Sequence, residues 1–539
     1  MVELYFHRIN PFMQALITAF HRRPLFWILL LAFMARLLAV FFARGYMMHD
    51  DHFLTIEPAA SWADGKNFND WMPGINNTRE HPEPISFFYL GFLYVFFEIF
   101  QAIGIDNPEM QMMLMRLIHA CYSLLTVYFV YRITEKIAGT KQAIQAGLLM
   151  ALLAVVPNFC VRNLVEMVCM PPLLAGYWWL LNAVSLSKVK IAHALKAGNV
   201  SQLLTWKFFA AAFVMGLAVG LRYQTGLLVA IVGMVLLFQH GYISALLFGF
   251  ISLTAFFITQ LDDVLLWGGQ PFQHLQGYIQ YNRAHAGSYP GSPYTYLSFI
   301  TLYIMPPVSL FLMFGFLRQW RSHLIIFLPV AGFLLFHILF SNRQERFILP
   351  ALPFVVILGV VGWQQFVKSS IFWLRQKALL KWCYGFFWAL NLIVMFVSCF
   401  TYSKMARVEA MLFLYQQGDC RNFVREASHT NAASMPPQFY SGDSWPVYYF
   451  YSDQNNVEAE MNDFANQESL YADKLHKRPV PNYFLFYDDE KMDERVQRVQ
   501  LHFPGLHHLT TIEAGWFDKL LHRLNEQNAI ERIHIYKTE

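Results

Sequence analysis

The chain has 539 residues, of which 56% are hydrophobic, 17% aromatic and only 14% charged, whereas about 25% of the residues in soluble domains are charged. This composition predicts an integral membrane protein. The net charge of +4 comes from basic residues in short clusters between apolar segments, which argues against a nucleic-acid partner. The six cysteines show neither a metal-binding spacing nor a disulfide framework.

The first apolar segment covers residues 25–42, and no small-residue cleavage site follows it. We therefore expect a retained first span and not a cleaved signal peptide. Cytoplasmic loops carry the excess of Lys and Arg, so Arg22 and Arg23 place the N-terminus inside. The first span then delivers a loop at residues 45–84 to the outer face of the membrane.

That outer loop begins with an unusually polar stretch that contains His49, Asp50, Asp51, His52 and Glu57. Carboxylates at the point where a helix leaves the bilayer are hydrated enough to ionise and close enough to act on a lipid headgroup. We therefore expect a lipid-linked substrate. On one continuous helix, Asp50 and Glu57 would share a face and Asp51 would point elsewhere. The alternative is a solvated loop with a helix N-cap at Asp50 or Asp51.

The next apolar run, residues 85–103, is interpreted as a helix in the outer interface because it is rich in aromatic residues. A second span here would place the basic residues 132–141 outside and reverse the charge pattern of every later loop. With the first span, the remaining apolar segments make about eleven spans. They are predicted at residues 112–131, 143–160, 164–184, 208–221, 227–238, 243–260, 294–316, 324–340, 347–363 and 384–402.

The chain changes character after residue 402, where charged residues become frequent and apolar runs become short. We expect a membrane domain at residues 1–402 and a soluble α/β domain outside the membrane at residues 403–539. Strands are predicted at residues 447–451 and 483–487, and helices at residues 460–475, 490–502 and 516–528. The tail lacks a nucleotide-binding glycine pattern, so it is interpreted as a structural or docking module and is assigned no chemistry.

The predicted topology brings two polar clusters to the same side of the membrane as the acidic stretch: Arg222 with Gln224, and Arg343 with Arg346. Guanidinium groups can bind phosphate oxygens through paired hydrogen bonds, which carboxylates cannot do. Arginines at span ends can also be mere topology or snorkelling residues. Two outer-facing clusters, against the positive-inside trend, favour contact with a lipid phosphate.

The acidic stretch resembles a motif of the lipid-linked mannosyltransferases of the endoplasmic reticulum, the group that contains the dolichol-pathway and glycosylphosphatidylinositol mannosyltransferases. Their first outer loop carries Asp-Glu, five residues and Glu-Pro. Asp50 matches the first acid, Asp51 stands where Glu is usual, and Glu57 and Pro58 match directly.

Two further stretches resemble motifs of the same family. Thr78-Arg79-Glu80 is similar to its Thr-Trp-Glu with the Trp replaced. Residues 342–347, followed by Pro350 and Pro353, are similar to its His-Lys-Glu-x-Arg-Phe with later prolines. Arg346, Phe347 and the prolines match, whereas Asn342, Arg343 and Gln344 depart from the pattern. The resemblance covers residues 20–365 and does not reach the tail.

The resemblance implies a multi-spanning glycosyltransferase of the C superfamily that takes a sugar from a polyprenyl phosphate and transfers it to a lipid-linked or cell-envelope glycan. Mannose is the favoured sugar. The departures from the motif at Asn342, Arg343 and Gln344 leave the acceptor and the sugar open. The additional tail indicates a bacterial relative, in an inner membrane; a eukaryotic protein would lie in the endoplasmic reticulum membrane. The expected partners are the lipid-linked donor, the glycan or glycolipid acceptor and membrane lipids.

The implied reaction is a single displacement with inversion that requires no cofactor. Asp50, or as second choice Asp51, would take the proton from the acceptor hydroxyl. Charge on the leaving lipid phosphate would be stabilised by Arg343, Arg346 and Arg222 with its neighbour Gln224, while Glu57 and Glu80 would orient hydroxyl groups. A divalent metal held by the aspartates with His49 and His52 is the less favoured alternative, because a lipid monophosphate does not require one.

Three alternatives stay open. The transferred sugar could be an aminosugar, glucose or an arabinose-like unit, with lipid A, a polysaccharide or a protein as acceptor. A transporter or flippase would share the composition, but its ionisable residues should lie at mid-span and its halves should repeat. The outer domain could also give the protein a purely structural or assembly role.

Overall fold

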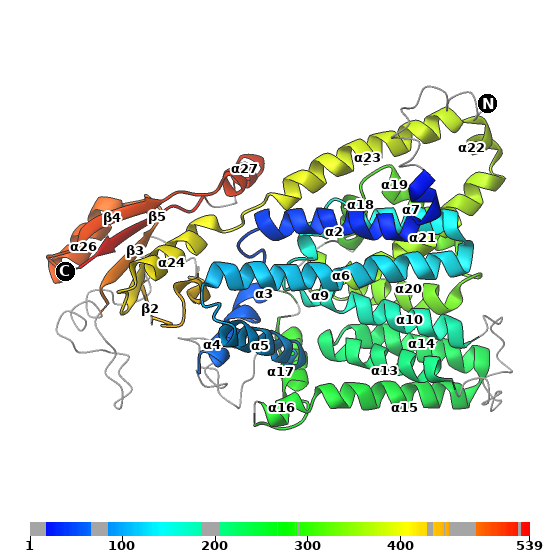
Figure 1. Cartoon of the computed structure of the whole chain (residues 1–539), viewed down its shortest axis with the longest axis horizontal. Coiled ribbons are helices and arrows are strands. Elements are labelled where there is room, and N and C mark those ends of the chain that lie inside the picture. The colour runs from blue at the N-terminus through cyan, green and yellow to red at the C-terminus, as the bar shows by residue number, and fades with distance from the viewer. Residues whose placement is uncertain are drawn as a thin grey trace. The chain divides into compact units, whose positions relative to one another are not determined.

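The structure is a computed structural model of the chain (Figure 1). It describes residues 18–65, 85–184, 205–266, 268–285, 287, 292, 294–427, 435–446, 448–451, 481–526 and 530–538. The chain forms two compact units, which are described separately. The helical unit comprises Met1–Phe41, Pro82–Tyr89 and Arg116–Phe400, and the mixed unit comprises Phe42–His81, Leu90–Met115 and Thr401–Glu539.

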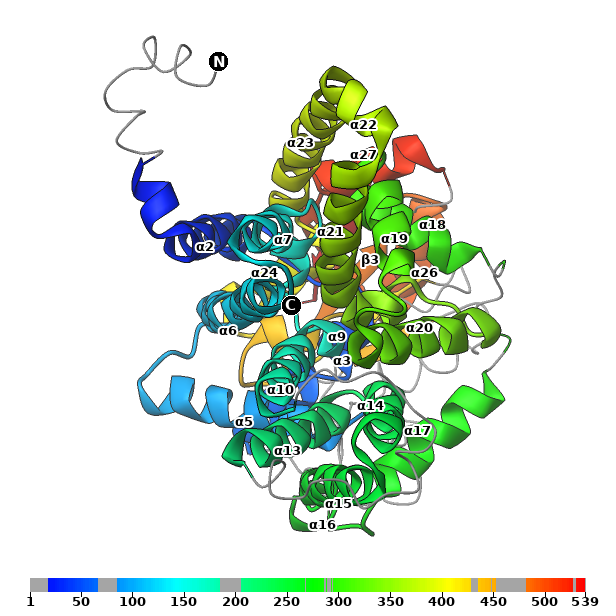
Figure 2. The same cartoon turned by 90° about the vertical axis from the view of Figure 1, so that its right-hand side faces the viewer.

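The helical unit is a bundle of apolar helices. In the series α10, α13, α15, α14, α20 and α21, each helix packs against the next. Helix α21 also packs on α7 and α19 (Figure 2). The elements, of which α6 begins in the mixed unit, are α2 (Pro24–Phe42), α6 (Pro108–Ala138), α7 (Thr140–Leu152), α8 (Val156–Phe159), α9 (Val165–Val168), α10 (Met170–Ala183), α13 (Trp206–Leu221), α14 (Thr225–His240), α15 (Tyr242–Thr259), α16 (Asp262–Leu265), α17 (Gln273–Ala284), α18 (Thr295–Ile304), α19 (Val308–Arg318), α20 (Leu324–Leu339), η2 (Glu345–Ala351), α21 (Leu352–Ser369), α22 (Ile371–Arg375) and α23 (Lys377–Cys399).

Several of these helices are long and apolar enough to cross a membrane. Among the described residues, five qualify: Pro24–Phe42, Pro108–Ala138, Tyr242–Leu265, Glu345–Ser369 and Lys377–Cys399. A sixth would be the bent pair of α18 and α19, while α13, α14 and α20 are apolar but shorter. The protein is therefore a membrane protein with a helical fold, and the count of about eleven spans stays a prediction.

Three of the predicted spans do not form one continuous helix each. The segment 143–160 ends its helix at Leu152 and continues as α8, and the segment 164–184 divides into α9 and α10. In the segment 294–316, α18 and α19 meet at 117°. Pro306 and Pro307 follow α18, and proline offers no backbone N–H with which to continue a helix.

The broken end of α7 is held by two polar side chains from other helices. Arg36 of α2 is fully buried and donates to the carbonyl oxygens of Met150 (3.4 Å) and Ala151 (3.2 Å). Asn391 of α23 donates to the carbonyl oxygen of Leu152 (2.7 Å) and accepts the N–H of Ala154 (2.9 Å). A helix end among apolar neighbours needs such partners because its last carbonyls have none within the helix.

The helices α19 and α21 approach each other through glycines. A Cβ atom at Gly362 would lie 2.0 Å from the carbonyl oxygen of Gly315, and one at Gly315 would lie 2.1 Å from that of Gly359. Small residues allow two backbones to touch directly, as in other membrane helix pairs. This contact fixes α21, whose apolar segment is almost wholly buried, at the centre of the bundle.

The mixed unit combines short helices with a five-stranded sheet in the order β2-β1-β3-β5-β4. Strand β1 pairs in parallel with β2 and β3, whereas β5 pairs antiparallel with β3 and β4. Besides part of α5 (Phe87–Ala102), its elements are α3 (Asp50–Phe53), α4 (Ile56–Ala63), α24 (Met405–Gln417), β1 (Phe423–Glu426), η3 (Gln438–Ser441), β2 (Tyr448–Tyr451), β3 (Tyr483–Tyr487), α26 (Met492–His502), β4 (His507–Ile512), α27 (Trp516–Leu524) and β5 (Ile533–Lys537).

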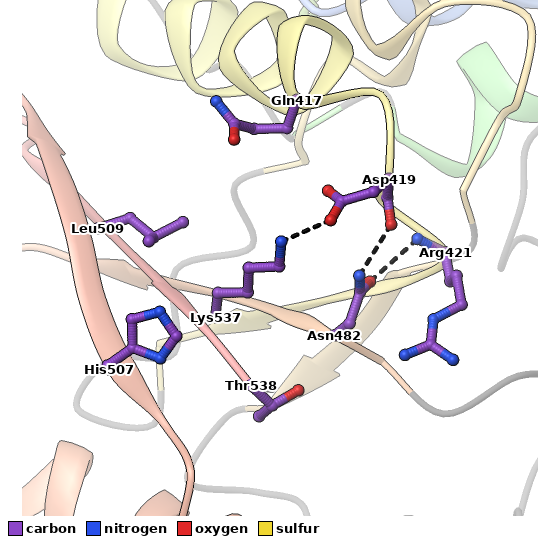
Figure 3. Close-up of a pocket in the computed structure, with 8 residues that line it drawn as sticks. All are labelled: Gln417, Asp419, Arg421, Asn482, His507, Leu509, Lys537 and Thr538. Carbon is purple, nitrogen blue, oxygen red and sulfur yellow. Dashed lines mark hydrogen bonds and ion pairs between the residues drawn. The ribbon is translucent and has the colours of Figure 1, made fainter.

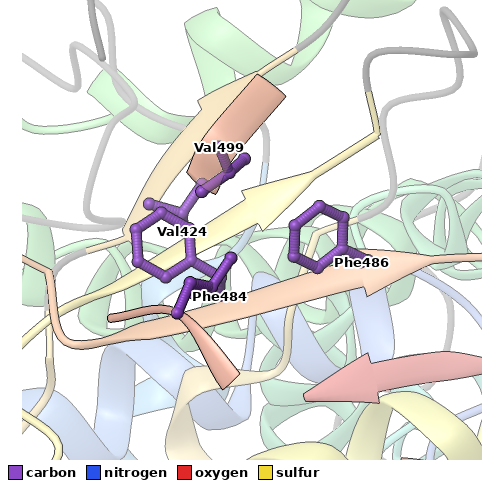
Figure 4. Close-up of a cluster of buried hydrophobic side chains, with 5 residues drawn as sticks. Val424, Phe484, Phe486 and Val499 are labelled. Atoms are coloured by element: carbon purple, nitrogen blue, oxygen red, sulfur yellow. The ribbon is translucent and has the colours of Figure 1, made fainter. Parts of the chain in front are cut away.

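The sheet and α26 enclose a small apolar core, formed by Val424, Phe484, Phe486, Val499 and Leu506 (Figure 4). Strands β2 and β3 and helices α26 and α27 confirm four of the elements predicted for the tail. The helix predicted at residues 460–475 lies outside the described residues. Strands β1, β4 and β5 were not predicted. The mixed unit also includes the first-loop helices α3 and α4, so the tail residues form one compact unit with the acidic stretch.

Candidate active site

The two aspartates of the acidic stretch differ in their surroundings. Asp51 is 4% exposed, and its carboxylate oxygens accept the N–H groups of Met47 (3.1 Å) and Met48 (3.1 Å). Asp50, the first residue of α3, is partly exposed. Because Asp50 is more exposed than Asp51, it is the better candidate for a group that acts on a substrate.

Glu57 does not share a helix with Asp50, which corrects the prediction of a common face. Helix α3 ends at Phe53, and α4 begins at Ile56. The hydroxyl of Thr55 donates to the carbonyl oxygen of Asp51 over 2.7 Å and closes the turn between the two helices. The hydrogen bond satisfies the backbone locally and allows the chain to change direction there.

The Glu57 carboxylate, predicted to orient a substrate hydroxyl, is 2% exposed and makes contacts within the mixed unit. Its Oε1 atom lies 3.2 Å from His52 Nε2 and accepts the backbone N–H of Phe439 over 3.1 Å. The His52 ring in turn stacks on Tyr440, with centroids 5.5 Å apart. Residues of η3, in the tail that the sequence marks as a structural or docking module, therefore support the acidic stretch.

The remaining residues of this stretch bear on the metal alternative. Burial lowers the pKa of His49 below its usual range, against the opposite effect of the Asp50 carboxylate. Within the part of the chain that the structure describes, no group of three or more His, Cys, Asp or Glu side chains is arranged to hold a metal ion. Glu80, the other predicted acid, lies outside the described residues, as does the rest of the stretch from Thr78.

In the helical unit, the structure brings Arg222 and Arg346 to one carboxylate. Arg222, directly after α13, places Nη2 2.9 Å from Glu166 Oε1. Arg346, in η2, places Nε 3.7 Å from the same oxygen and donates from Nη2 to Gln344 Oε1 over 2.8 Å. Both guanidinium groups also lie over the ring of Phe347, at 5.1 Å and 5.8 Å. We call Arg222, Arg346 and Glu166 the arginine cluster.

The other two predicted phosphate-binding residues make different contacts. Arg343 donates from Nη2 to the carbonyl oxygen of Ile338, near the end of α20, over 3.0 Å. Gln224, which precedes α14, donates to the hydroxyl of Tyr278 in α17. Gln224 thus ties α14 to α17, and Arg343 lies against the end of α20.

Glu166 is the member of the arginine cluster that the sequence prediction missed. It lies in α9 and is fully buried. The signal was present, since Glu166 is the only Asp, Glu, Lys or Arg between Arg162 and Lys188. An ionisable residue inside an apolar segment marks a functional site by default, and its partners here are two arginines.

A polar pocket of about 770 Å³ lies in the mixed unit, where β1, β3 and β4 begin and β5 ends (Figure 3). Its polar groups bind one another: Lys537 Nζ lies 2.5 Å from Asp419 Oδ2, and the Asn482 side chain bridges Asp419 and Arg421 through their backbone groups. We assign no ligand to this pocket because its charged pair is already matched.

The fold is that of the multi-spanning membrane glycosyltransferases of the C superfamily. The structure of ArnT from Cupriavidus metallidurans bound to undecaprenyl phosphate matches with a TM-score of 0.53 at 12% identity, over 94% of this chain and 98% of that chain. The apo structure of ArnT matches with a TM-score of 0.53 at 12% identity, over 95% of this chain and 97% of that chain. The archaeal oligosaccharyltransferase AglB from Archaeoglobus fulgidus has a TM-score of 0.48 at 10% identity, over 91% of this chain and 73% of that chain.

The chain belongs to the Alg9-like mannosyltransferase family, whose profile matches residues 27–435. This match confirms the family resemblance inferred from the motifs, and the protein is a glycosyltransferase. The match extends past residue 365 into the tail, which corrects the expected extent of the resemblance. No curated protein matches the chain. The matched residues include the acidic stretch and all three members of the arginine cluster, and they end just before η3.

Proposed function

We propose that this protein transfers a mannosyl residue from a polyprenyl-phosphate donor to a glycan or glycolipid acceptor on the extracytoplasmic side of a bacterial inner membrane. The observation that carries the proposal is the arginine cluster, in which two largely buried guanidinium groups lie within the region matched by the family. The fork of a guanidinium group suits a phosphate. The undecaprenyl phosphate bound to ArnT supports a polyprenyl carrier, and the family name favours mannose.

In the proposed reaction, Asp50 takes the proton of an acceptor hydroxyl as its oxygen attacks the anomeric carbon of the donor. The bond between that carbon and the phosphate oxygen breaks, and its electron pair stays with the lipid phosphate. Attack from the opposite face inverts the anomeric carbon. A positioned base contributes about 10² to 10⁴ in rate, and the guanidinium groups stabilise the charge that develops on the phosphate.

The leaving phosphate is a weak base, so the reaction requires no general acid and no metal ion to make it depart. Asp51 is placed second as a base because its carboxylate holds two backbone N–H groups. Glu57 supports the acidic stretch through His52 and Phe439. For Glu80 the role in orienting a hydroxyl group stays a proposal from the family motif.

The proposal is tested with purified full-length protein in detergent and a panel of labelled donors. Undecaprenyl-phosphate mannose should be consumed in the presence of a glycan acceptor, and undecaprenyl-phosphate glucose and aminosugar donors should be consumed more slowly. Faster use of an aminosugar donor would contradict mannose as the transferred sugar, but it would leave the proposed reaction class intact. Use of a nucleotide sugar, with no turnover of any lipid-phosphate sugar, would overturn the class of donor.

A further inference from the structure

Glu166 places a full negative charge inside a site proposed to bind a negative ligand. Its carboxylate is fully buried, 2.9 Å from Arg222 and 3.7 Å from Arg346. Two guanidinium groups and one carboxylate carry a net charge of about +1, whereas the two arginines alone would carry about +2. A phosphate site built only for tight binding would not contain this acid, so its presence calls for a functional reason.

The charges of donor and product supply that reason. A sugar-bearing lipid phosphate is a phosphodiester with one negative charge, whereas the lipid phosphate left after transfer is a monoester with a charge of about −1.5 to −2 at neutral pH. Electrostatic repulsion grows with the ligand's charge. The Glu166 carboxylate therefore opposes the product more strongly than it opposes the donor.

We propose that Glu166 is a positioning residue that sets the net charge of the arginine cluster, so that the lipid phosphate is released after sugar transfer. The inference rests on the proposed function, because it takes a polyprenyl-phosphate sugar as the donor. Glu166 also fixes where the guanidinium groups lie, since Arg222 extends from the end of α13 and Arg346 from η2 towards the same Oε1 atom.

A purely structural role would have different consequences. If Glu166 only joined α9 to α13 and η2, its loss would disorder both arginines and weaken donor and product together. If it sets the charge of the site, its loss leaves about one more positive charge and strengthens product binding more than donor binding. The ratio of the two dissociation constants separates these roles, whatever the overall stability of the variant.

Gln344 offers the opposite change at the same cluster. Its Oε1 atom accepts from Arg346 Nε (3.0 Å) and Nη2 (2.8 Å), and its side chain is only partly buried. Gln344→Glu keeps the shape of the side chain and adds a negative charge next to Arg346. It should fold, because a carboxylate can accept the same two hydrogen bonds, and it should weaken product binding more than donor binding.

The experiment measures direct binding of undecaprenyl phosphate and of undecaprenyl-phosphate mannose to full-length protein in detergent, for wild type, Glu166→Gln, Glu166→Asp and Gln344→Glu. We expect the ratio of the product to the donor dissociation constant to fall about tenfold in Glu166→Gln and to rise severalfold in Gln344→Glu. Glu166→Asp keeps the charge and should stay near the wild-type ratio.

An unchanged ratio in Gln344→Glu, or a parallel loss of both affinities in Glu166→Gln, would overturn the proposal. If Glu166→Gln does not fold, the proposal is decided by Gln344→Glu alone, through the direction in which the ratio of the product to the donor dissociation constant changes. Sugar transfer by the wild type is measured in parallel. Turnover with an unchanged binding ratio contradicts only the role of Glu166, whereas a wild type that binds neither ligand contradicts the proposed function as well.

Discussion

The backbone N–H of Phe439 donates to the buried carboxylate of Glu57 over 3.1 Å. The two residues lie 382 positions apart in the chain, and the contact is reinforced by the stacking of His52 on Tyr440. The segment around η3 thus forms part of the support of the acidic stretch. The tail, which the sequence marks as a structural or docking module, thus contacts residues beside the candidate base.

The stacking of Tyr440 on His52 gives the first prediction. Tyr440→Ala removes the ring that holds the imidazole next to Glu57, so we expect turnover to fall about tenfold, because a misplaced catalytic loop is costly. Tyr440→Phe keeps the ring and is the matched control. Steady-state sugar transfer measures the effect. Equal activity of Tyr440→Ala and Tyr440→Phe would show that the stacking contact does not support the site.

The different surroundings of Asp50 and Asp51 give the second prediction. Asp50→Asn removes the proposed proton acceptor, so single-turnover transfer should fall by about 10² or more while donor binding stays unchanged. Asp51→Asn replaces one accepting oxygen by an amide N–H group and should lower stability by about 1–3 kcal/mol. If Asp50→Asn transferred sugar at the wild-type rate, Asp50 would be excluded as the base. Losses in both variants that added divalent cation reverses would favour a metal site.

The third prediction concerns Arg346. Arg346→Ala should weaken donor use by on the order of 2–5 kcal/mol if the guanidinium pairs with a desolvated phosphate. Arg346→Lys should restore only part of it, because the ammonium group lacks the fork. Arg318→Ala is the control, since Arg318 lies over Phe314 and Phe366 in the same bundle and outside the cluster. Donor kinetics of Arg346→Ala that equal those of the control would remove Arg346 from the phosphate site.

The fourth prediction concerns membrane topology. A reporter fused after Tyr402 should be extracytoplasmic, and one inserted at residues 188–207 should be cytoplasmic, because this asymmetry follows from basic residues summed over several loops. Alkaline phosphatase and green fluorescent protein fusions at both points read out the two sides. Reporters on the same side would contradict the extracytoplasmic placement of the acidic stretch and the tail.

The fifth prediction concerns pH and the ion pair of Glu531 with Arg407 in the mixed unit. Burial by itself would raise the pKa of Glu531, but Arg407 outweighs this effect, so the pKa lies below its usual range. The pair therefore stabilises the fold above the ordinary glutamate pKa, and this contribution is lost as the pH falls through the lowered value. Glu531→Gln should lower the free energy of opening β5 at neutral pH by about 1–3 kcal/mol.

Hydrogen exchange of the peptide that covers β5 measures this opening. The difference between wild type and Glu531→Gln should shrink as the pH falls below about 4. Glu526→Gln changes an exposed acid nearby and should behave as the wild type at every pH. A difference that persists unchanged in acid would show that the ion pair is not its source.

Sequence reasoning succeeded where one physical signal dominates. The helices α2, α13 and α15 begin and end within two residues of their predicted bounds, because long apolar runs flanked by polar residues leave little choice. It failed at the breaks after Leu152 and Ile304, since an apolar run looks the same whether its helix continues or turns. The break after Leu152 depends on hydrogen bonds to Arg36 and Asn391, which are distant in sequence.

The candidate site was likewise predicted only in part, because the sequence reveals local signals and not contacts between distant residues. The family motifs identified Asp50 and Arg346, whose types and spacing are local signals. The motifs did not reveal Glu166, because its partner Arg222 is distant in the sequence. Strand β1 was missed in a similar way: its Arg425 and Glu426 look like surface residues, but Glu426 is buried against Arg495 over 2.5 Å.

The capping of α7 has a consequence for how the protein is made. Asn391 follows Leu152 by 239 residues, so the end of α7 leaves the ribosome long before one of its two hydrogen-bonding partners has been synthesised. Arg36 precedes it and is available from the start. The bundle therefore cannot complete this junction until translation has reached α23, and a chain that stops earlier lacks the hydrogen bonds that Asn391 makes at the end of α7.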